Sequence, residues 1–140
     1  MTDAELKKLT LATAERLIRG KEISPIELTL AVLDRIGRLN ERMRAFITVT
    51  PEVALERARA AEKADGQRSP LRGVPISLKD LFDTKDIRTT AGAKIFENRI
   101  PDEDATVVRK LNDAGAVLVG KTNLHEFAFG VTTINPHFGV

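Results

Sequence analysis

The chain has 140 residues, 42% of them apolar and 30% charged, a length and balance typical of one folded domain and not of a disordered chain. Its 22 basic and 20 acidic side chains leave a net charge of +2, without the basic stripe or aromatic platforms of a nucleic-acid-binding protein. No apolar run is long enough to span a membrane, and no signal peptide is recognisable. The lack of cysteine excludes disulfides and thiolate metal sites and fits a cytoplasmic location.

The first 66 residues have the apolar periodicity of helices, which we predict over residues 10–20, 24–39 and 51–64. Gly20 stands where a glycine commonly ends a helix just beyond its last turn. Ser24 and Glu27 form a capping box, and the proline between them falls at the first helical position, which tolerates it. Thr50 repeats this cap-then-proline pattern, and Asp65-Gly66 is expected to end the third helix.

Short apolar runs separated by turns follow in residues 67–140. Residues 74–79 are predicted to form a strand, and Asp104 is predicted to cap a helix that runs through Ala114 and ends at Gly115. The continuously apolar residues 116–120 are typical of a strand that is buried on both faces. Strand, helix and strand in this order predict a parallel βαβ crossover, so we expect an α/β fold with N-terminal helices followed by a βαβ unit.

Two short motifs match known ligand-binding patterns without their structural context. Residues 115–122 satisfy the phosphate-binding pattern G-x-x-x-x-G-K-[ST], but a helix precedes the first glycine and the intervening residues favour a strand. We interpret them as a helix end, a core strand and a turn that bind no nucleotide. His125-Glu126 begins a zinc-binding H-E-x-x-H pattern, but Phe129 takes the place of the second histidine, so no metal site is predicted.

Lys79 is the residue whose position points most directly to chemistry. Alternation along the predicted strand puts Ile76 and Leu78 on one face and Ser77 and Lys79 on the other. Lys79 then lies at the carboxyl end of a strand in a parallel sheet, where ligands bind in open α/β folds. A desolvated lysine loses its proton more readily, and the neutral amine can act as a base. The alternative is a lysine that leaves the strand and reaches water.

The motifs of the amidase signature family resemble five groups of residues here, in order and in spacing. These are Leu71-Arg72-Gly73-Val74-Pro75-Ile76-Ser77-Leu78-Lys79-Asp80, Thr89-Thr90-Ala91-Gly92, Asp104-Ala105-Thr106-Val107-Val108, Gly115-Ala116 leading to Gly120-Lys121-Thr122-Asn123, and Glu126-Phe127-Ala128 with Gly130. The resemblance implies that residues 1–140 are the N-terminal part of a single amidase domain, helical over 1–66 and α/β over 67–140, with no complete second domain. Its βαβ unit would then be part of that fold's larger mixed sheet.

The chemistry that the resemblance implies is cleavage of carboxamide C–N bonds by a Ser–cis-Ser–Lys triad, without a cofactor or a metal. Lys79 matches the family's catalytic lysine and would have to be neutral, so we expect it to be buried. Ala128, Phe129 and Gly130 match a segment that lines the family's substrate pocket. Both serines would follow Val140, so the chain alone is expected to be inactive on its small-molecule amide substrate.

Three interpretations stay open. The whole protein is a stand-alone amidase, or it is the A subunit of a tRNA-dependent amidotransferase. The third interpretation is that the chain as given is a non-catalytic folded fragment or an engineered piece, useful only as a scaffold. The A subunits of such amidotransferases usually have other residues at the positions of Leu124, His125 and Phe129. This difference favours the stand-alone amidase. A sheet that is only part of a larger one would leave an edge and an apolar face uncovered, so we also expect self-association. No nucleic acid or membrane partner is expected.

Overall fold

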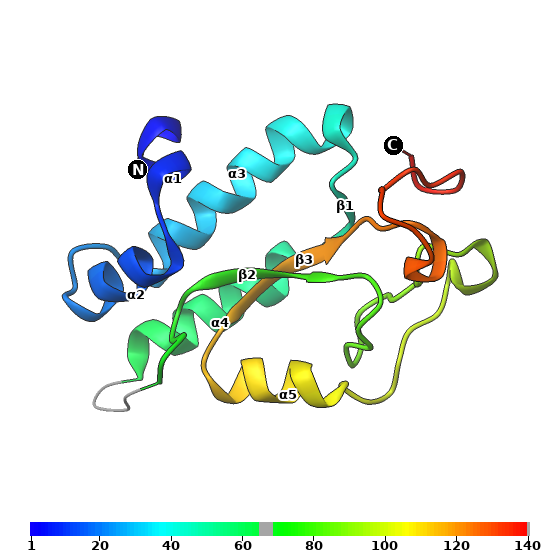
Figure 1. Ribbon diagram of the computed structural model, residues 1–140. Helices are drawn as coiled ribbons and strands as arrows, with labels where there is room; N and C mark the ends of the chain where they lie inside the picture. The colour runs from blue at the N-terminus through cyan, green and yellow to red at the C-terminus, as the bar shows by residue number, and fades with distance from the viewer. Residues whose placement is uncertain (65–68, 140) are drawn as a thin grey trace. The chain divides into compact units, whose positions relative to one another are not determined.

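The computed structural model describes residues 1–64 and 69–139 and has the α/β class that the sequence predicts (Figure 1). Its helices are α1 (Asp3–Lys8), α2 (Leu11–Arg19), α3 (Pro25–Met43), α4 (Pro51–Lys63) and α5 (Thr106–Asp113), and its strands are β1 (Phe46–Val49), β2 (Pro75–Lys79) and β3 (Val117–Thr122). Two short 3-10 turns, η1 (Lys94–Phe96) and η2 (Glu126–Ala128), lie in the connections. None of the helices in the described part of the chain is both long and apolar enough to cross a membrane.

The described residues divide into two compact units that interleave along the sequence. The first comprises residues 1–38, 50–76 and 111–119, and the second comprises residues 39–49, 77–110 and 120–140. Strands β2 and β3 therefore each begin in the first unit and end in the second.

An aliphatic cluster between helices forms the core of the first unit. Ala14, Ile18, Leu28 and Val74 are buried together. Partly buried aliphatic side chains from α1, α3 and the connections on either side of α2 pack against them. The capping box predicted at the start of α3 is confirmed: the Ser24 N–H donates to the Glu27 carboxylate at 3.1 Å, and the Glu27 N–H donates to the Ser24 hydroxyl at 3.4 Å.

Several local predictions for the first half need correction. The left-handed residue after α2 is Lys21 (φ 57°), and Gly20 keeps a right-handed helical conformation. Thr50 does not cap α4, because its hydroxyl donates to the Leu118 carbonyl oxygen at 3.1 Å instead. Helix α1 and strand β1 were not predicted. Both are short, and α1 contains no buried residue, so it lacks the apolar periodicity that reveals a longer helix. The helix end expected at residues 65–66 lies outside the described residues.

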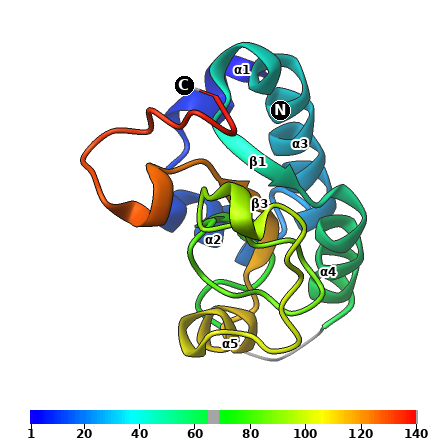
Figure 2. The same ribbon diagram turned by 90° about the vertical axis from the view of Figure 1, so that its right-hand side faces the viewer.

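The three strands form one mixed sheet in the order β1-β3-β2. The Val117 N–H donates to the Val74 carbonyl at one end, and the Asp80 N–H donates to the Thr122 carbonyl at the other, so β2 and β3 run in the same direction. Helix α5 connects them, which confirms the predicted βαβ crossover, and Gly115 ends that helix with φ +79°. Strand β1, which Figure 2 shows in full, pairs with β3 in the antiparallel direction.

A glycine in β3 allows β1 to approach closely. A Cβ atom at Gly120 would lie 2.6 Å from the Thr48 carbonyl oxygen and 2.9 Å from the Phe46 ring. We therefore predict that Gly120→Ala lowers the free energy of unfolding by about 1–3 kcal/mol, the usual cost of overpacking. Gly37→Ala is the control, because nothing lies within 4 Å of its Cβ position in α3 and alanine favours a helix by about 0.5–1 kcal/mol. Urea titrations of both variants measure the two changes; equal effects would contradict the prediction.

Candidate functional site

Lys79 is the last residue of β2, and its side chain is exposed. Leu78 is buried and Ser77 is exposed, so the alternation predicted along this strand is confirmed at its carboxyl end. The burial expected for Lys79 is not found, because no described part of the chain covers this face of the strand end. An exposed ammonium keeps its hydration, so the described residues do not supply the desolvation that a lysine base needs.

The residue after Lys79 is buried and held by several hydrogen bonds and one ion pair. Asp80 has no exposed surface, and its carboxylate accepts hydrogen bonds from the N–H and the hydroxyl of Thr90 at 2.8 and 2.5 Å. Its own carbonyl oxygen accepts the Ala91 N–H at 2.8 Å, while its N–H donates to Thr122. The second carboxylate oxygen faces the ammonium of Lys121 at 3.3 Å. The main chain directly after Lys79 is therefore held in one conformation.

Lys121 is fully buried in β3 and makes the other half of this ion pair. Its ammonium also donates to the Phe82 carbonyl oxygen at 2.9 Å and to the Thr89 hydroxyl at 2.6 Å. Burial lowers the pKa of Lys121, and the Asp80 carboxylate acts in the opposite direction. Two hydrogen-bond acceptors and a facing carboxylate surround an amine that has three N–H donors in its charged form. We therefore assign Lys121 as an ammonium ion.

A second ion pair lies beside the first. Arg99 donates two hydrogen bonds of 2.6 Å to the two carboxylate oxygens of Asp83, and these bonds lower the pKa of Asp83. The Lys121 ammonium lowers it further. Two cations and two carboxylates therefore balance one another around the turn that follows β2.

The segment expected to line a substrate pocket is a strained turn. Phe127 and Ala128 both have positive φ, at 53° and 58°, and the Phe129 side chain is 89% exposed. The Phe127 N–H donates to the Ala91 carbonyl oxygen, and Ala91 is bonded to Asp80. The structure thus connects this turn to the residue beside Lys79 through Ala91. It does not enclose Phe129 as the wall of a cavity.

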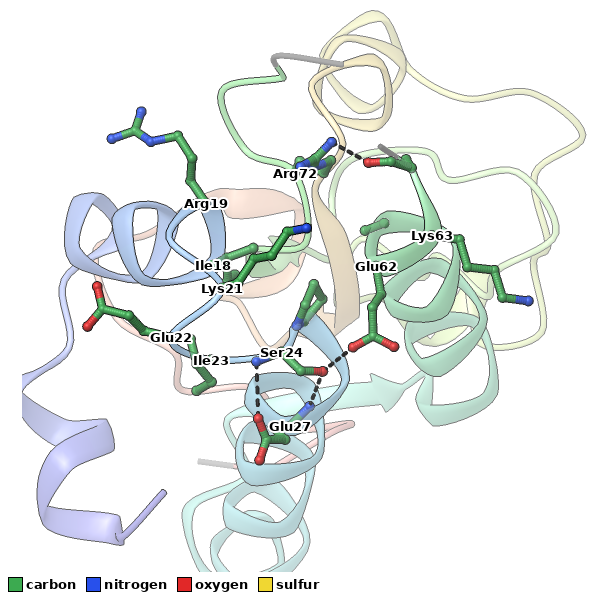
Figure 3. A pocket seen from close by; sticks show the side chains of 13 residues that line it. Ile18, Arg19, Lys21, Glu22, Ile23, Ser24, Glu27, Glu62, Lys63 and Arg72 are labelled. Carbon is green, nitrogen blue, oxygen red and sulfur yellow. Dashed lines mark hydrogen bonds between the residues drawn. The ribbon is translucent and has the colours of Figure 1, made fainter. Parts of the chain in front are cut away.

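Two cavities in the described part of the chain lie away from these residues. One, of about 460 Å³, lies between residues of α2, α3 and α4 in the first unit, and Figure 3 shows Ser24, Glu27 and Glu62 hydrogen-bonded within it. The other, of about 480 Å³, lies in the second unit against Phe46 and Phe138. Neither is lined by Lys79 or by residues 128–130. Among the described residues, no cluster of three or more histidine or acidic side chains could hold a metal ion.

Comparison with known proteins agrees with the motifs around Lys79. Residues 27–140 match the model of the family described as Amidase. The chain belongs to the amidase family. It is 47% identical over 137 residues to the A subunit of the glutamyl-tRNA(Gln) amidotransferase of Geobacter sp. (strain M21), and this match covers 96% of the chain and 28% of that relative.

Solved amidase-family structures share the fold. The native peptide amidase from Stenotrophomonas maltophilia superimposes with a TM-score of 0.80 at 38% identity, over 86% of this chain and 26% of that one. The 6-aminohexanoate cyclic dimer hydrolase complexed with substrate gives a TM-score of 0.84 at 30% identity, over 94% and 27%. The chain therefore spans little more than a quarter of the length of the amidases it matches.

The Asp80–Lys121 pair was not predicted from the sequence. In the sequence, Lys121 belongs to the phosphate-binding pattern and to one family motif, and Asp80 ends another family motif. A usable signal was present, because a lysine inside a continuously apolar strand must find an acceptor if it is buried. Which acceptor it finds depends on the path of the chain between β2 and α5.

The surroundings of Lys121 make a nucleotide site in residues 115–122 impossible without unfolding β3. These residues form a helix end and a central strand, and the ammonium is already bonded to Asp80, Phe82 and Thr89. We predict that isothermal titration with ATP or GTP and Mg²⁺ gives no binding heat. Saturable binding in the micromolar range would contradict this prediction.

Proposed function

We propose that this chain supplies the base lysine of an enzyme that cleaves carboxamide C–N bonds. The observation that carries the proposal is the position of Lys79, which ends a parallel strand with its side chain exposed and its neighbour fixed, in a chain whose residues 27–140 match the amidase family. Ligands bind outside the carboxyl ends of such strands. We further propose that residues 1–140 form the N-terminal part of one amidase domain.

The proposed reaction uses a Ser–cis-Ser–Lys triad whose two serines lie in the remaining part of the whole protein. The neutral amine of Lys79 takes the proton of the bridging serine, which takes the proton of the nucleophilic serine. The nucleophile attacks the carbonyl carbon, the C–N bond breaks, and the leaving amine receives the transferred proton. Water then hydrolyses the acyl-enzyme ester and releases the carboxylic acid. In the whole protein, the remaining chain would desolvate Lys79, and residues 128–130 would contact the substrate.

A second candidate is the glutaminase role within a tRNA-dependent amidotransferase. The 47% identity to the Geobacter relative favours it, while Leu124-His125 and Phe129 favour a stand-alone amidase. Ammonia release from simple amides without partner subunits would indicate the stand-alone enzyme. Release that requires the other subunits would indicate the amidotransferase. The cytoplasmic location stays a prediction from the sequence.

The role of Lys79 can be tested in a hybrid in which residues 1–140 replace the matching segment of the Geobacter relative. The hybrid is expected to release ammonia from glutamine or a simple carboxamide, in the presence of that enzyme's other subunits. We predict that Lys79→Ala lowers kcat by at least about 10³-fold, as removal of a triad member does. Lys110→Ala, an exposed lysine of α5, is the matched control and should leave kcat unchanged. An inactive hybrid, or a Lys79→Ala hybrid with unchanged kcat, would contradict the proposal.

Self-association of the isolated chain is also proposed. Ile95, Phe129 and Val131 are 81%, 89% and 104% exposed, an unusual display of large apolar side chains in one unit. We predict that sedimentation velocity shows dimers or larger species at high protein concentration. Phe129→Ser is expected to shift the distribution toward the monomer. A homogeneous 15.4 kDa monomer at all concentrations would count against it.

A further inference from the structure

The direction in which Lys79 points is set by the main chain and not by contacts of its own side chain. Within residues 1–64 and 69–139, its ammonium has no hydrogen-bond or ion-pair partner, and the side chain is exposed. A base must lie within about 3 Å of the group whose proton it removes. Since the side chain makes no contact that fixes it, the direction of its Cα–Cβ bond must be set by the main chain. The peptide bond between Lys79 and Asp80 is the nearest candidate.

Hydrogen bonds of Asp80 fix the orientation of that peptide bond at the carboxyl end of β2. Its N–H is bonded to Thr122 in β3, its carbonyl oxygen to Ala91, and its carboxylate to Thr90. Asp80 directly follows β2 and continues its alternation of side chains, so an Asp80 side chain held inside leaves the Lys79 side chain pointing outward. Rotation of Asp80 would break bonds to two segments that are distant from each other in the sequence, residues 90–91 and residues 121–122.

Lys121 holds the same turn from the inside. Its ammonium joins the Asp80 carboxylate to the Phe82 carbonyl oxygen and the Thr89 hydroxyl, which stand at the two ends of the loop that follows β2. The neighbouring Asp83–Arg99 pair is partly exposed, whereas neither side chain of the Asp80–Lys121 pair has any exposed surface.

An ion pair buried to this degree is a weak source of stability, because two apolar side chains of similar volume often serve as well. Its presence next to the proposed base therefore calls for a second role. We propose that Asp80 and Lys121 are positioning residues, which hold the turn after β2 so that the Lys79 amine meets the proton it removes. This inference rests on the proposed function of Lys79.

The test uses the active hybrid described above and removes both charges at once. In Asp80→Asn/Lys121→Met neither charge is left unpaired, so the variant avoids the large loss of stability that follows when one partner is removed. kcat and KM are measured well below the melting temperature of each variant, with Lys110→Met as the control for a lysine outside the site. We expect KM to stay within about twofold and kcat to fall at least about tenfold, because a displacement near 1 Å can cost about a hundredfold in rate.

The outcomes separate this role from a structural one. A double variant that melts at a lower temperature but keeps its kcat would overturn the positioning role, as would a rise in KM alone. If the double variant does not fold, Thr90→Val answers the same question, because it removes the hydroxyl that donates to Asp80 and accepts the Gly92 N–H and leaves both charges in place. A fall of at least about threefold in its kcat at constant KM supports the role, and an unchanged kcat overturns it. If Lys79→Ala leaves kcat unchanged, the proposed function itself is wrong. If Lys79→Ala lowers kcat but the double variant keeps a normal kcat, only the positioning role is wrong.

Discussion

The ammonium of Lys121 lies inside the second unit with no exposed surface, and much of the surrounding chain is arranged to satisfy it. A buried charge without partners is far more costly than a buried apolar side chain, so the loop after β2 must bring acceptors to it. Asp80 supplies the opposite charge, and Phe82 and Thr89 supply the remaining acceptors. The same constraint orders the residues that flank Lys79.

Strained backbone is found in the turn bonded to Asp80 and in the turn bonded to Ala91. Ala91 and Gly92 both have positive φ, as do Phe127 and Ala128. Such conformations cost on the order of 1 kcal/mol or more for a non-glycine residue and persist only where other contacts enforce them. The buried Asn135 side chain supplies one such contact, because its amide donates to the Gly92 and Leu124 carbonyl oxygens. The turns beside Lys79 are therefore held by side chains distant in sequence.

Local signals in the sequence predict the elements that depend on local bonds. The Ser24 capping box, the Gly115 helix end and the apolar run of β3 all carry their structural information within a few residues. The helix end predicted at Gly20 is wrong by one residue, because the left-handed residue after α2 is Lys21. β1 escaped prediction because its four residues are only half-buried and their partner strand lies far along the chain, at residues 117–122.

The candidate site shows the same division between local and distant information. The family motif identified Lys79, and alternation along β2 predicted which way its side chain points. Whether the Lys79 side chain is buried could not be predicted from the strand, because burial depends on which other segments pack over that face. The pairing of Asp80 with Lys121 depends on how the loop of residues 81–89 returns to β3, which no pattern of two or three residues encodes. Contacts between residues far apart in the sequence, such as Asp80 and Lys121, are therefore what the structure adds to the prediction.

The interleaving of the two units has a consequence for how the chain acquires its fold. The first unit needs residues 111–119, although most of it is complete by residue 76. During synthesis from the N-terminus, its helices would emerge well before the strand that completes them. Contacts between residues so distant in sequence form slowly, and apolar surface stays exposed while they are missing. The helical segments therefore lack part of their core until β3 has been synthesised.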